Sequence, residues 1–151
     1  MEQNLRSKTR VKHEAYATVL HSSERYVCGA ITLAQSLLKT GTKRDLLLLI
    51  DSSISVRKRH ALANAGWKIR TITRIGNPRG KNGTYNKYNY TKIRLWQLTD
   101  YEKIIFIDSD IFVLRNLDIL FNFPQMSATG NARSIFNAGM MVIEPSNCTF
   151  R

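Results

Sequence analysis

The sequence has few of the residues that mark disulfide-rich, metal-stabilised or membrane-spanning proteins. Its 151 residues include only two cysteines and three prolines, which excludes a disulfide framework and a four-ligand cysteine zinc site. No apolar run approaches the roughly 18–20 residues of a membrane span, and Met1–Asn4 lacks the apolar core of a signal peptide. Cys28 lies in an apolar helical pattern, which predicts a buried thiol. We expect one compact domain without a membrane segment.

Acidic residues are also scarce, with 11 Asp and Glu against 23 Lys and Arg, for a net charge of +12. The excess is uneven, because residues 1–75 hold 14 bases and 5 acids while residues 76–151 hold 9 and 6. A basic face indicates an anionic partner such as nucleic acid, a phosphorylated ligand, an acidic polysaccharide or a membrane surface. The same excess of basic residues is equally compatible with a well-solvated surface, so charge alone does not show whether the chain has an anionic partner.

Strand and helix patterns alternate along the first half of the chain. Buried strands are predicted at 15–20, 46–50 and 68–72, and helices at 24–38 and 56–65, with Asp51–Ser53 offering caps for the second helix. This order predicts an α/β fold with a mostly parallel, doubly wound sheet. Such sheets bind ligands beyond the carboxyl ends of their strands, which places the turn His21–Ser23 at the binding edge.

The second half holds a long loop and a carboxylate pair. Residues 76–90 are rich in Gly, Asn, Tyr and bases, and 91–98 return to a helical pattern. The buried strand 104–107 ends in Asp108-Ser109-Asp110. Carboxylates at i and i+2 can share Mg²⁺ or Mn²⁺, although the same residues can cap an ordinary turn. A metal held by two side chains has open positions that a diphosphate can fill, which favours a nucleotide-activated donor.

Three further features fit such a donor, each with a simpler alternative. Lys92 opens a helix where its ammonium could meet a phosphate, or it is an exposed helix lysine. Asn137 precedes a glycine turn before the strand 140–143 and could contact sugar hydroxyls, or the segment is an ordinary turn. Tyr26 stands one turn into the first helix, where its ring stacks on a base or packs in the core.

Four segments together resemble a known family. They are Thr18–Ser22 with Tyr26 and Gly29-Ala30, Tyr88–Leu98, Phe106–Asp110 and Phe136–Met140, within about Ala15–Phe150. In this order they resemble glycosyltransferase family 8, the glycogenin-like retaining transferases with a GT-A fold. Within that family the sequence is most similar to the plant branch that adds glucuronic acid to xylan.

The resemblance implies one donor-binding site drawn from these segments. Its residues are Leu20, His21, Ser22, Tyr26, Lys92, Asp108, Ser109, Asp110, Asn137 and Ala138. The first four would line a uridine pocket, and Asp108 and Asp110 would hold Mn²⁺ or Mg²⁺ against the diphosphate. Ser109 would lie beside the ribose, Lys92 would contact the donor, and Asn137 with Ala138 would border the transferred sugar. The family arginine before the lysine helix has no certain counterpart, with Lys81 or Lys87 as stand-ins.

The implied function is a metal-dependent retaining transfer of a sugar, glucuronic acid by likeness, from a UDP-sugar to a polysaccharide such as xylan in the Golgi lumen. The later acidic motif and the His-x-x-Gly-x-x-Lys-Pro-Trp segment of the family are not found before Arg151. Residues 14–151 are therefore expected to be the N-terminal part of a truncated GT-A domain, after a flexible basic lead-in at 1–13. Such a part would transfer little or no sugar.

The residues by themselves leave two other interpretations of the chain open. The chain could be a basic, non-catalytic module that binds nucleic acid or acidic polysaccharide through its basic half. Nucleic acid is disfavoured because no nucleic-acid motif is present and charge supplies only nonspecific affinity. It could also be an unstable truncated product, which would show no cooperative thermal transition.

Overall fold

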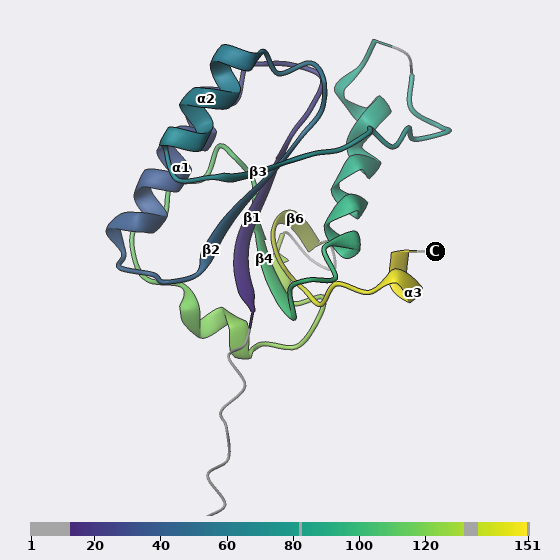
Figure 1. Cartoon of the computed structure of the whole chain (residues 1–151). Coiled ribbons are helices and arrows are strands. Elements are labelled where there is room, and N and C mark those ends of the chain that lie inside the picture. Colours follow the sequence, from purple (N-terminus) through teal and green to yellow (C-terminus); the bar gives the residue numbers. More distant parts are fainter. Residues whose placement is uncertain (1–12, 82, 132–135, 151) are drawn as a thin grey trace, which may run out of the picture.

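One six-stranded sheet organises the computed structural model, which describes residues 13–81, 83–131 and 136–150. The strand order is β3-β2-β1-β4-β6-β5. Figure 1 labels all of these strands except β5, together with helices that flank the sheet. The strands are β1 (Glu14–Leu20), β2 (Asp45–Ile50), β3 (Lys68–Thr71), β4 (Lys103–Ile107), β5 (Ala128–Gly130) and β6 (Phe136–Ile143). β1 pairs in parallel with β2 and β4, and β2 with β3, whereas β6 runs antiparallel to β4 and β5.

Helices cover both faces of the sheet. α1 (Val27–Lys39) and α2 (Val56–Asn64) lie on one side, and the 3₁₀ segment η1 (Tyr85–Gln97) lies on the other (Figure 1). The short α3 (Asn147–Phe150) packs beside η1, and η2 (Asp118–Asn122) precedes β5. The mostly parallel α/β fold predicted from the alternation of strands and helices is confirmed.

The continuous aliphatic run in β2 explains why helices must cover both faces of the sheet. Leu46, Leu48 and Ile50 face α1 in one core cluster, while Leu47 and Leu49 join Leu95 and Trp96 of η1 in the other. Successive side chains of a strand point to opposite faces, so a continuous apolar run is buried only when both faces are covered. No helix among the described residues is both long and apolar enough to cross a membrane.

The structure corrects two predictions about the first helix and the turn after β2. Cys28 is exposed, because Val27, Ala30 and Leu33 face the sheet and leave its thiol on the outer side of α1. Asp51–Ser53 does not cap α2, whose N-cap is Ser55. Asp51 turns instead toward Ser53 and the backbone of the turn after β1.

Two element boundaries in the second half also differ from the predictions. The helical segment begins at Tyr85 and has a kink at Tyr88, so the loop before it is shorter than 76–90. The predicted turn at 136–139 is the beginning of β6, because Phe136 and Asn137 pair with Gly130 and Thr129 of β5. The predicted lead-in 1–13 lies outside the described residues except for His13.

Candidate functional site

The carboxyl ends of β1 and β4 open into two cavities that share residues. The first, of about 220 Å³, is lined by Val19, Leu20, His21, Tyr26, Asp108, Ser109 and Asp110. The second, of about 450 Å³, is lined by His21, Ser22, Ser23, Arg25, Tyr26, Gly83, Thr84 and Tyr88. The chain leaves β1 toward β2 and returns to β4 on the other side of β1, which makes this edge a topological switch point. The sequence motifs from both halves of the chain therefore meet here.

The carboxylate segment is held by its neighbours on both sides. The Asp108 backbone N–H donates to the Gly139 carbonyl of β6 over 2.7 Å, and the Ile111 N–H donates to the Asp108 carbonyl over 3.1 Å. Ser109 is buried, and a Cβ built on Gly29 of α1 would lie only 2.5 Å from the Ser109 carbonyl oxygen. Since only glycine permits so close an approach, α1 fixes the position of this segment.

Lys92 forms an ion pair with the first carboxylate. Its Nζ lies 2.7 Å from Asp108 Oδ1, 3.4 Å from the Ala138 carbonyl oxygen and 4.7 Å from the centroid of the Phe106 ring. Burial raises the pKa of Asp108, as does the charge of Asp110, while the hydrogen bond and charge of Lys92 oppose the rise. Lys92 is thus part of the carboxylate site rather than an exposed helix lysine.

β6 brings Asn137 and Gly139 to the same place. Asn137 Oδ1 accepts a hydrogen bond from the Gly139 N–H over 2.7 Å. A Cβ on Gly139 would lie 2.9 Å from Asn137 Oδ1 and 3.4 Å from Asp108 Oδ2, so glycine keeps open the space beside both oxygens. Carboxylate and amide oxygens are hard ligands that suit Mg²⁺ or Mn²⁺. The donor set therefore fits such a cation.

The turn after β1 forms the opposite wall. His21 is buried, its Nδ1 lies 2.9 Å from Ser22 Oγ, and Ser22 adopts a left-handed backbone with φ of +65°. Tyr26 is the N-cap residue of α1 rather than one turn inside it, and its side chain is 39% exposed. The core-packing alternative for Tyr26 is wrong, and its ring lines both cavities.

Acidification is expected to destabilise the folded chain through His21. Burial lowers the pKa of His21, which Arg74 and Lys92 lower further and Asp51 opposes. Below the ordinary pKa of about 6.5 the unfolded chain takes up a proton that the folded chain resists, so the free energy of unfolding falls. Urea unfolding at about pH 7.5 and 5.5 measures this fall, which should be smaller in H21Q.

The exposed His60 of α2 provides the control. H60Q should lose as much stability on acidification as the wild-type chain. Equal losses in the wild type and H21Q would contradict the role given to His21.

The site also contains residues that the sequence motifs did not include. Asp51 and Arg74 contact the turn at Ser22, whereas neither Lys81 nor Lys87 lines the two cavities. Lys87, in the first turn of η1, has its Nζ 3.5 Å from the Asn77 carbonyl oxygen of the preceding loop. The position of Arg74 shortly after β3 was the available signal, because side chains at the carboxyl ends of parallel strands meet at one edge.

The carboxylate pair is not a complete cage of protein ligands. In the described ranges 13–81, 83–131 and 136–150, no group of three or more His, Cys, Asp or Glu side chains could hold a metal ion. A cation beside the carboxylate pair would therefore need ligands besides these side chains.

Comparison with known proteins identifies the family. The family model described as Glycosyl transferase family 8 matches residues 17–129. The chain belongs to this family. It is 72% identical over 141 residues to UDP-glucuronate:xylan alpha-glucuronosyltransferase 2 of Arabidopsis thaliana. That match covers 93% of this chain and 24% of the relative, so the chain spans about a quarter of the relative's length.

Solved structures show the fold of this family 8 chain. The galactosyltransferase LgtC aligns with a TM-score of 0.65 at 16% identity, over 86% of this chain and 57% of LgtC. The glycosyltransferase GlyE of Streptococcus pneumoniae aligns with a TM-score of 0.60 at 18% identity, over 89% of this chain and 34% of GlyE. The GT-A fold expected from the sequence is confirmed.

Proposed function

We propose that residues 14–151 form the donor-binding part of a retaining glycosyltransferase that transfers glucuronic acid from a UDP-sugar to a xylan-like polysaccharide. The observation that carries the proposal is the carboxylate pair at the end of β4, which shares a cavity with the turn after β1. The likeness to a xylan glucuronosyltransferase supports the donor sugar and the acceptor. It also supports a Golgi location.

The carboxylate side of the site would bind the diphosphate. Asp108 and Asp110 would hold Mn²⁺ or Mg²⁺, which when bound supplies positive charge against the diphosphate and the departing nucleotide. Lys92, 2.7 Å from Asp108, adds a second positive charge at the same place. A site with two carboxylates and one nearby ammonium needs that cation to attract a diphosphate.

The other walls would bind the ends of the donor. Leu20, His21, Ser22 and Tyr26 lie where they can enclose the uridine, with the exposed ring of Tyr26 available to stack on the base. Ser109 would lie beside the ribose, which is supported by its position between the two carboxylates and in the lining of the same cavity as Leu20. Ala138 on β6 lies beside Lys92, through its carbonyl oxygen, and Asn137 precedes it on the same strand. These two residues would border the transferred sugar.

Calorimetric titration of the 151-residue chain with UDP tests the proposal. UDP should bind in the presence of Mn²⁺ and much more weakly in EDTA, because the cation links the diphosphate to the carboxylates. A second titration at higher salt should change the Mn²⁺-dependent affinity only modestly. Binding of nucleic acid or acidic polysaccharide with steep salt dependence, together with indifference to Mn²⁺ and UDP, would instead support the basic non-catalytic module.

A further inference from the structure

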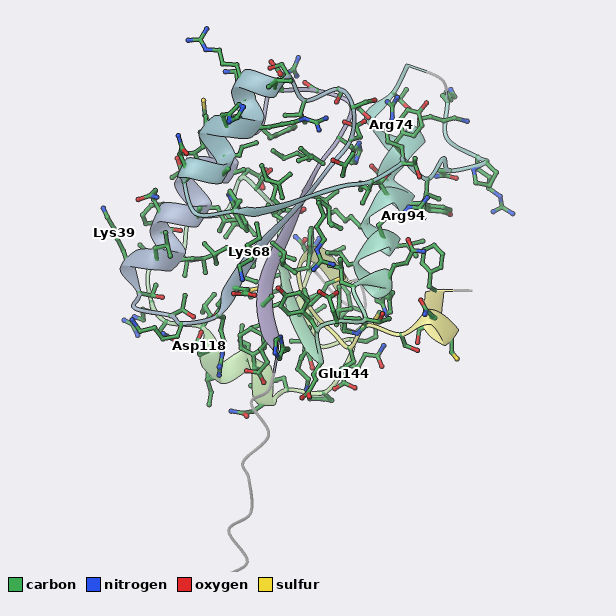
Figure 2. The ribbon with its side chains drawn as sticks, viewed as in Figure 1. Lys39, Lys68, Arg74, Arg94, Asp118 and Glu144 are labelled. Carbon is green, nitrogen blue, oxygen red and sulfur yellow. The ribbon has the colours of Figure 1, made fainter. Side chains whose placement is uncertain are left out.

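A charged network ties the turn after β1 to three other elements. Asp51, the first residue after β2, has a side chain that is 4% exposed, and its Oδ2 lies 3.1 Å from Arg74 Nε. The same Oδ2 accepts a hydrogen bond from the Ser22 backbone N–H over 3.2 Å. Arg74 also donates from Nη1 to Ser22 Oγ over 3.2 Å, and its guanidinium lies 4.3 Å from the centroid of the Tyr88 ring of η1. Figure 2 labels Arg74 at the upper edge of the molecule, close to η1.

The charges in this network compensate each other. Burial opposes ionisation of Asp51, but hydrogen bonds from Ser53 and Ser22 and the charge of Arg74 hold the pKa of Asp51 below its ordinary value. A buried carboxylate that stays charged is tolerated when it is paired and hydrogen-bonded. Arg74 provides the pairing charge, and its planar fork reaches the Asp51 carboxylate and the Ser22 hydroxyl at once.

The strained residue of the turn is the one that the network holds. Ser22 has φ of +65°, a conformation that a residue with a side chain keeps only when its surroundings fix it. Asp51 holds the Ser22 backbone and Arg74 holds its hydroxyl, which also lies 2.9 Å from His21 Nδ1. The geometry of the turn therefore depends on a residue that is distant in sequence and outside the family motifs.

We infer that Arg74 is a positioning residue for the nucleoside subsite, which it shapes through Ser22 and Asp51. This inference rests on the proposed function, because it takes the turn after β1 as the uridine pocket. Arg74 contacts Ser22 of the turn after β1 and Asp51, which holds the Ser22 backbone, so its effect falls on the part of the ligand that this turn would enclose. Uridine and UDP should then depend on Arg74 to the same degree, whereas a phosphate-binding arginine would affect UDP alone.

The test compares R74Q with R70Q by calorimetry with uridine and with UDP in Mn²⁺. Arg70 is a matched control, because it is an arginine of β3 that pairs with Asp100 away from the cavities. R74Q should weaken both ligands by about tenfold, the loss expected for one charge-assisted hydrogen bond, and R70Q should leave both unchanged. R74K keeps a positive charge beside Asp51 and should therefore keep the fold. Its loss of affinity for both ligands should be smaller than that of R74Q.

A double-mutant cycle with S22A separates positioning from general destabilisation. If Arg74 acts through Ser22, adding R74Q to S22A should weaken uridine binding further by less than about twofold. Additive losses, a loss for UDP alone, or unchanged affinities in R74Q and R74K would each overturn the inference while leaving the proposed function intact. A wild-type chain that binds neither ligand would overturn the proposed function and the inference with it.

Discussion

D110N is expected to bind UDP about 100-fold more weakly than the wild-type chain in the presence of Mn²⁺. Removal of a group that only hydrogen-bonds to a metal ligand already costs about 10- to 100-fold in metal affinity or activity, and a direct carboxylate ligand contributes more. Asp110 is exposed, so its loss leaves no buried charge without a partner, and the free energy of unfolding should stay within about 0.5 kcal/mol. Calorimetry in Mn²⁺ and in EDTA, with urea unfolding in parallel, measures both quantities.

Two further variants sharpen this expectation. D108N should show the same loss of Mn²⁺-dependent affinity but also reduced stability, because it leaves the Lys92 ammonium beside a neutral amide. D100N serves as the control, since Asp100 pairs with Arg70 on the surface and lines neither cavity. If D110N bound UDP in Mn²⁺ as tightly as the wild type, the assignment of this pair to the metal would be wrong.

G29A is expected to reduce both stability and UDP affinity, although Gly→Ala in a helix normally stabilises by about 1 kcal/mol. The added Cβ would lie 2.5 Å from the Ser109 carbonyl oxygen, which belongs to the backbone and cannot rotate away. Overpacking of this kind costs about 1–3 kcal/mol, so after the helix gain the net change in unfolding free energy is destabilising by up to about 2 kcal/mol. Relief of the contact requires a shift of about 0.5 Å, comparable with the tolerance of a binding site, so UDP affinity in Mn²⁺ should fall about tenfold or more.

G130A is the matched control for this substitution. A Cβ on Gly130 would meet no heavy atom of the described residues within 4 Å, and the φ of Gly130 is outside the left-handed region. Urea unfolding and UDP titration of G130A should match the wild type. A G29A chain that gained about 1 kcal/mol of stability and kept its UDP affinity would show that α1 does not fix the carboxylate segment.

Much of the fold follows from the sequence because its signals are local. The apolar run Leu46–Ile50 requires burial on both faces, and the structure places it between α1 and η1. The start of β6 was not predicted from the sequence, because it depends on pairing with other strands and not on a local signal. Asn137 and Gly139 are residue types common in turns, but pairing with β4 and β5 overrides that local preference.

The site candidates named from motifs cluster at one edge of the sheet. The position of Arg74 after β3 indicated that it could reach this edge, but its contacts with Asp51 and Ser22 were beyond prediction. Asp51 looked like a helix cap because Asp followed by serines commonly begins a helix. Its partner Arg74 lies on another strand end, and no spacing pattern relates the two. The close approach of Gly29 to Ser109 likewise depends on how α1 crosses the sheet. Such tertiary contacts arise from packing between segments that are distant in sequence.

The central position of β1 sets the order in which the chain can assemble. During synthesis β1 can pair with β2 as soon as residue 50 has emerged, but its other edge waits for β4, which ends at Ile107. Until then an open edge and an apolar sheet face stand exposed, the condition in which nascent chains aggregate. The proposed donor site comes into being at the same late step, because β4 carries the carboxylate segment into place. A ligand can therefore stabilise the sheet only after β4 has paired, and chaperone protection is most needed between those two points of elongation.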